Sequence, residues 1–78
     1  MKEIDQLIDA LKKSEKLATK IAQEIQKNRD GLGLAKTQSY RKFTWKVKTE
    51  CNSYWQSLEI MKKRFKQLKS FEASNNAD

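Results

Sequence analysis

The residues best suited to chemistry lie between positions 40 and 48, where the sequence reads YRKFTWKVK. Aromatic and basic side chains interleave there, and no acidic residue interrupts them. Aromatic rings among cations bind phosphates and stacked bases, or an acidic protein surface. We therefore predict a binding surface at this position, made by six residues: Lys36, Arg41, Lys42, Trp45, Lys46 and Lys48. The alternative is a solvated helix face whose one tryptophan is covered by lysine stems or buried in an oligomer.

The sequence offers no set of residues that would support catalysis. It has no histidine and a single cysteine, Cys51, so it contains neither a histidine base nor a Cys/His pair. No metal-ligand spacing is present, and the glycines of GLG at 31–33 are not followed by the Gly-Lys-Ser/Thr element of a phosphate-binding loop. We expect a protein that is not an enzyme, with no catalytic residue, metal, cofactor or small-molecule substrate.

The net charge of +7 is unevenly distributed along the chain. Residues 1–30 are nearly balanced, whereas residues 31–78 carry ten basic and four acidic residues. This asymmetry predicts an acidic protein or nucleic acid as partner. The segment KKRFK at 62–66 also resembles a short nucleic-acid patch, but Phe65 belongs to an apolar stripe, so we interpret its lysines as a solvated flank.

Composition also indicates where the protein works. A single cysteine favours a reducing compartment, and no apolar run approaches the ~18 residues that span a bilayer. The N-terminus has acidic residues where a secretory signal has its apolar region. We expect a cytoplasmic protein without a membrane span.

The elements that must position the binding residues are two long helices. With no proline and two glycines, both near position 32, the chain is expected to form one domain, 1–78. Apolar residues recur every three or four positions and predict a helix over about 2–29, a turn over about 30–36 and a helix over about 37–72. The polar tail 73–78 is expected to fray.

The second helix carries the more regular apolar stripe. Its predicted core and self-association residues alternate by four and three: Val47, Cys51, Tyr54, Leu58, Met61, Phe65, Leu68 and Phe71. Cys51 is in phase with this stripe and is expected to be a buried small hydrophobe. Trp45 lies nearly opposite the stripe, so it is expected at the surface. Two alternatives remain open: a strand around Phe43–Val47, and a helix break near residue 52, where Ser53 and Gln56 would form a capping box.

Together these patterns predict an all-α fold, an antiparallel helical hairpin in which residue i of the first helix lies opposite about 66 minus i of the second. Two helices leave half of each wide stripe in water, so we expect a homodimer that forms a four-helix bundle. A compact three-helix bundle is the alternative. The expected function is a small non-catalytic, self-associating protein that binds and modulates a larger macromolecule through its basic turn-proximal end. The alternative is a sequence-nonspecific nucleic-acid-binding protein.

Overall fold

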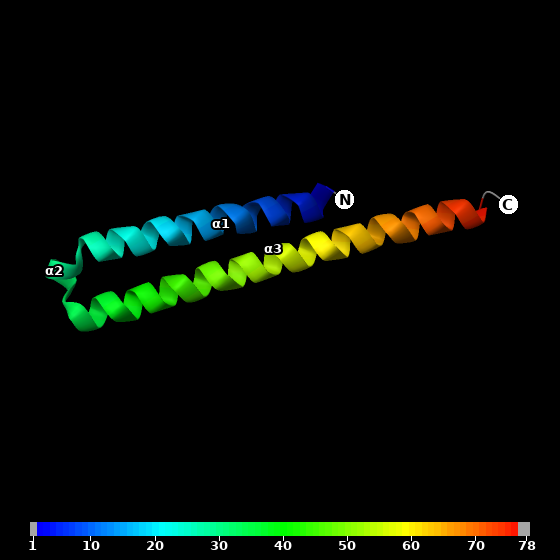
Figure 1. Cartoon of the computed structure of the whole chain (residues 1–78). Coiled ribbons are helices and arrows are strands. Elements are labelled where there is room, and N and C mark those ends of the chain that lie inside the picture. Colours follow the sequence, from blue (N-terminus) through cyan, green and yellow to red (C-terminus); the bar gives the residue numbers. More distant parts are fainter. Residues whose placement is uncertain (1, 77–78) are drawn as a thin grey trace.

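The computed structural model describes the backbone of residues 2–76 and the side chains of residues 2–69. Its elements are α1 (Lys2–Lys27), the single turn α2 (Arg29–Leu32) and α3 (Leu34–Asn76). Helices α1 and α3 lie side by side and antiparallel, and α3 continues well past the N-terminus of α1 (Figure 1). The described backbone is therefore all helical, as the sequence pattern predicts.

The connection between the long helices is shorter than the predicted turn over 30–36. Helix α1 ends at Lys27, and Asn28 donates from its side-chain Nδ2 to the carbonyl of Glu24 at 2.8 Å. After α2, Gly33 has φ 86°, a left-handed conformation that favours glycine, and α3 starts at the next residue. Thr37 lies in the first turn of α3, and its hydroxyl donates to the carbonyl of Gly33 at 2.7 Å.

Helix α3 is one continuous helix of 43 residues. It begins three residues before the predicted start and extends to Asn76, beyond the predicted end near 72. Neither the strand around Phe43–Val47 nor the break near residue 52 occurs, so both alternatives are excluded. Neither proline nor glycine interrupts this stretch, and the helical hydrogen-bond ladder therefore runs through it unbroken.

Three polar contacts between the helices define their register. Asp5 pairs with Lys62, Glu15 with Asn52 and Gln26 with Arg41, and in each pair the residue numbers add up to 67. The predicted register of 66 is therefore correct to within one residue. Because this sum is the same at both ends of α1, the pairing register between the two helices does not change from the turn to the N-terminus.

The core between the helices is thin. The described side chains include four buried apolar ones: Ile4, Ile8, Ala18 and Cys51. The register places the small Ala18 opposite position 49 of α3, and two threonines of α3 nearer the turn, Thr37 and Thr44, are also buried. Both threonine hydroxyls donate to carbonyls four residues earlier, Thr37 to Gly33 just before α3 and Thr44 to Tyr40, so neither hydroxyl is left unsatisfied.

Candidate interaction surface

The apolar stripe predicted on α3 is divided by the structure into a covered and an open part. Cys51 is buried and Val47 and Leu58 are half-buried, but four residues of the stripe are exposed: Tyr54, Met61, Phe65 and Leu68. The side chain of Phe71 lies outside the described residues. The face of α3 that meets α1 is instead centred on Thr44, Cys51 and Trp55, roughly a fifth of a turn away from the middle of the stripe at 100° per residue.

Helix α1 shows the same displacement. Ile4, Ile8 and Ala18 face α3, while Leu7 and Ile21 remain exposed. On both helices the exposed apolar residues are rotated from the contact face in the same sense along the chain. Because the helices are antiparallel, equal rotations bring both sets to the same side of the hairpin. The hairpin therefore has one apolar face, made by seven exposed residues: Leu7, Ile21, Tyr40, Tyr54, Met61, Phe65 and Leu68.

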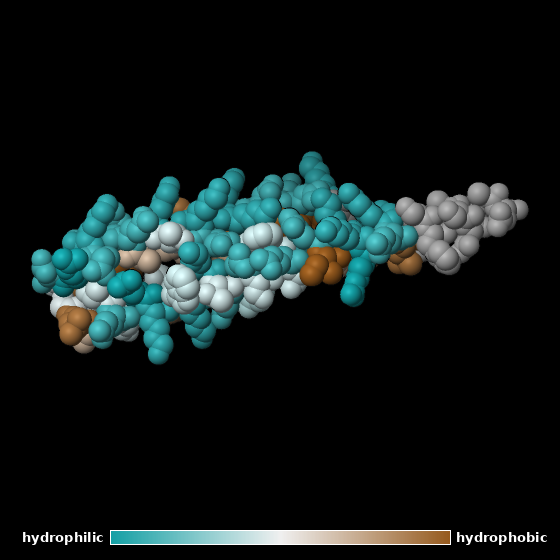
Figure 2. Space-filling model, viewed as in Figure 1, coloured by the Kyte–Doolittle hydropathy of each residue, from teal (hydrophilic) through white to brown (hydrophobic). Residues whose placement is uncertain are grey.

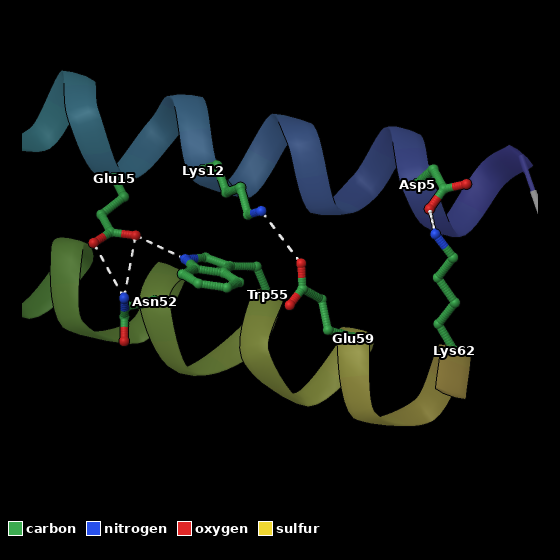
Figure 3. A network of polar contacts seen from close by, with 7 residues as sticks. All are labelled: Asp5, Lys12, Glu15, Asn52, Trp55, Glu59 and Lys62. Carbon is green, nitrogen blue, oxygen red and sulfur yellow. Dashed lines mark hydrogen bonds and ion pairs between the residues drawn. The ribbon is translucent and has the colours of Figure 1, made fainter. Parts of the chain in front are cut away.

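The opposite edge of the helix interface is polar. Glu15 accepts hydrogen bonds from Trp55 Nε1 at 2.7 Å and from Asn52 Nδ2 at 3.2 Å (Figure 3). Lys12 places its Nζ 4.6 Å from the centroid of the Trp55 ring and 3.2 Å from Glu59 Oε1. These polar contacts hold Trp55 in place against α1. The view in Figure 2 shows a surface that is mostly hydrophilic.

This polar cluster was not predicted from the sequence. The register alone contains the signal, since it puts Glu15 opposite position 51 or 52 and within one helical turn of Trp55. Further along the same edge, Lys62 donates to Asp5. That hydrogen bond, helped by the positive charge of Lys62, lowers the pKa of Asp5 from its ordinary value of 3.8, although partial burial of the carboxyl opposes the shift.

The predicted binding residues all lie at the turn-proximal end, but they point in different directions. Trp45 is 65% exposed, and Lys48 Nζ lies 4.9 Å from its ring centroid. Arg41 turns toward α1, where its Nη1 donates to Gln26 Oε1 at 2.9 Å. Lys36 is exposed and lies on a different side of α3 from Trp45. The structure thus brings Trp45 and Lys48 together and separates Arg41 and Lys36 from them.

Lys42 and Lys46 belong to a shallow groove on the outer side of α3, away from α1. The side chains that line this groove are Ser39, Lys42, Phe43, Trp45, Lys46, Thr49 and Glu50. Phe43, which the sequence prediction did not include in the binding surface, is 66% exposed. The groove therefore offers two exposed aromatic rings with two lysines between them and an acidic residue, Glu50, at one end.

Comparisons with known proteins add nothing to this description: no protein-family model, no curated protein and no solved structure matches the chain. Within the described residues, no helix is long and apolar enough to cross a membrane. The same residues contain no group of three His, Cys, Asp or Glu side chains that could hold a metal ion. The candidate surfaces are therefore the outer groove of α3 and the apolar face.

Proposed function

We propose that this protein is a non-catalytic, self-associating helical hairpin that binds and modulates a larger acidic macromolecule through its turn-proximal end. The observation that carries the proposal is the outer groove of α3, where Phe43 and Trp45 are each about two-thirds exposed beside Lys42 and Lys46. Large aromatic residues at the surface and in cationic surroundings are typical of the centres of binding sites.

Charge distribution supports the same end of the molecule. Residues 20–46, which include the turn and the ends of α1 and α3 beside it, hold seven basic and two acidic residues. A net charge of +5 therefore lies in about a third of the chain. A positive field of this kind speeds the encounter with an acidic partner and selects against basic ones.

An acidic protein surface is the partner that this geometry supports best. A nucleic-acid backbone is bound by cations that follow one groove. Here Arg41 is engaged with α1, Lys36 points to another side, and Glu50 lies at the end of the groove. Separated cations around a pair of exposed rings fit discrete carboxylates on a protein better than a continuous row of phosphates.

Nucleic acid is the second candidate, because exposed rings beside lysines can also stack on unpaired bases. Two probes separate the candidates: a polyglutamate chain and a mixed-sequence single-stranded oligonucleotide, each titrated over a range of salt concentrations. The proposal expects tighter binding to polyglutamate. Tighter binding to the oligonucleotide, with a steep salt dependence and no sequence preference, would favour the second candidate.

The site itself is tested by a pair of double variants that remove equal charge. Lys42→Ala with Lys46→Ala alters the groove, whereas Lys63→Ala with Arg64→Ala removes two charges far from the turn. We expect the first pair to weaken polyglutamate binding by roughly tenfold or more and the second to change it by less than about threefold. Equal losses would show that binding follows net charge and that the groove has no role.

A further inference from the structure

The apolar face is the largest feature of the hairpin that the basic groove does not explain. Its residues lie on both helices and extend along the whole length over which α1 and α3 pair. The apolar face carries almost no charge. One charged side chain, Glu50, is in phase with it, at its margin, within the stretches 7–21 of α1 and 40–68 of α3. A nearly uncharged face does not suit the acidic partner proposed above, so it needs a different occupant.

The hairpin exposes more surface than a compact protein of its mass, so it has area available for a partner. The accessible surface is 6557 Å², whereas a compact protein of 9.2 kDa exposes about 4,900 Å². The difference is about 1,700 Å², roughly twice the area that each partner buries in a standard interface. The radius of gyration of 19.3 Å likewise exceeds the roughly 11–12 Å of a compact domain of this length.

The positions of the exposed residues indicate which occupant fits. On α3 the apolar residues are arranged symmetrically about Tyr54, since Tyr40 and Leu68 are each fourteen positions from it and Val47 and Met61 are each seven. On α1, Leu7 and Ile21 are each seven positions from Ser14. The register places Ser14 opposite position 53, so both centres lie at the same level of the hairpin.

We infer that a second copy of this chain covers the apolar face, with the turn of each copy beside the open end of the other. In this arrangement a two-fold axis runs across both helices at the level of Ser14 and Tyr54. It packs α1 against α1 of the second copy and α3 against α3 of the second copy, and both pairs are antiparallel. Leu7 then meets Ile21 of the second copy, and Leu68, which lies beyond the N-terminus of α1, meets Tyr40. The result is a four-helix bundle in which apolar residues meet apolar residues along the whole face.

Charge selects this orientation over the one with both turns at the same end. Each turn-proximal end carries +5 within residues 20–46. Placing two such ends together would oppose association, and the antiparallel arrangement puts them at opposite ends of the bundle. The middle of each binding groove, with Lys42, Trp45 and Lys46, also remains free on the outer side of α3, whereas Phe43 and Glu50 lie at the margin of the covered face.

The face is tested by adding the same charge to two neighbouring residues. Tyr54→Lys places a cation at the centre of the apolar face, and Ser53→Lys places one on the outer side of α3. Sedimentation equilibrium is expected to show a dimer for the wild-type chain and for Ser53→Lys, and a rise in the dimer dissociation constant of roughly thirtyfold or more for Tyr54→Lys. Circular dichroism checks that both variants keep their helices. A monomeric wild-type chain at tens of micromolar would overturn the inference.

The orientation is tested by cross-linking in a Cys51→Ala background. Ser14→Cys should form a disulfide between copies on mild oxidation, because the axis passes beside it. Ile25→Cys should not form one, because position 25 lies eleven residues from the level of the axis. The two copies of position 25 are on opposite sides of that level and therefore roughly 30 Å apart. A dimer in which Ile25→Cys links, or Ser14→Cys does not, would overturn the antiparallel arrangement. The inference rests on the self-association in the proposed function but not on the groove, and polyglutamate binding can fail while both dimer tests succeed.

Discussion

Trp45 and Trp55 show how the same residue type takes two roles on one helix. Trp55 lies against α1, where its indole N–H donates to Glu15 and Lys12 lies over its ring. Trp45 is largely exposed, and Lys48 of its own helix lies over one side of its ring. Ten positions separate them, which on a helix is nearly three turns with an offset of about 80°. That offset turns one ring toward the neighbouring helix and the other toward solvent.

The two tryptophans are therefore expected to differ in their effect on stability. Trp55→Ala removes half-buried ring surface and leaves Glu15 without its closest donor, so we expect it to lower the free energy of unfolding by roughly 2–3 kcal/mol. Trp45→Ala should lower it by less than about 1 kcal/mol. Urea unfolding followed by circular dichroism measures both. A larger loss for Trp45→Ala would mean that its ring is part of the core and not a binding surface.

Asp5 gives the hairpin a dependence on acid. Its pKa is lowered in the folded chain by the hydrogen bond from Lys62, so its stabilising effect is fully present above the ordinary value of 3.8 and is lost as pH falls through the lower folded value. We expect the urea concentration at the unfolding midpoint to decrease as the pH is lowered from about 5 to about 2.5. The decrease should be smaller in Asp5→Asn. The same decrease in Asp5→Asn as in the wild-type chain would show that other carboxyls cause the acid sensitivity.

At the scale of the elements, the sequence pattern predicts the two helices and their register but not the rotation of α3. Periodicity identifies an apolar stripe, and the turn length fixes which residues lie opposite each other. The stripe is wider than one neighbouring helix can cover, so any of several rotations would bury part of it. The structure selects the rotation in which Glu15 meets Trp55 and Asp5 meets Lys62. These are pairwise contacts between helices, and a single helix pattern does not contain them.

The same reasoning explains why the candidate site was found only in part. Trp45 could be predicted at the surface because it lies opposite the stripe on α3. Phe43 flanks the stripe and was not included in the predicted binding surface, yet it is exposed because α1 covers the other flank of the stripe. The groove is lined by residues on both sides of α3's outer surface, and its composition follows from that rotation.

Cys51 reports on how firmly the two helices stay together. It is buried between α1 and α3, and a thiol reagent reaches it only when the helices separate locally. We expect native labelling to be at least about tenfold slower than labelling in denaturant. Similar rates in both conditions would show that the hairpin opens readily and that its thin core is not protected.

At the scale of the whole molecule, the hairpin measures 70 × 16 × 11 Å and has two different sides. One side is apolar, the other has the polar contacts of Figure 3, and the outer groove of α3 lies between them, with Phe43 and Glu50 toward the apolar side and Trp45 toward the polar side. The proposed self-association and the proposed ligand binding therefore use neighbouring surfaces that meet at Phe43 and Glu50. They are also coupled through charge, since every copy carries +7.

Salt should affect the two associations in opposite directions. Two copies repel each other, and raising the salt concentration from about 50 mM to about 500 mM screens that repulsion, so the dimer should become tighter. Binding of polyglutamate is attractive between opposite charges, so the same change should weaken it. Sedimentation equilibrium and binding titrations, carried out in the same two buffers, measure both effects. If salt weakens the dimer as well, ion pairs between copies hold it together, and the apolar face is not the surface that the second copy covers.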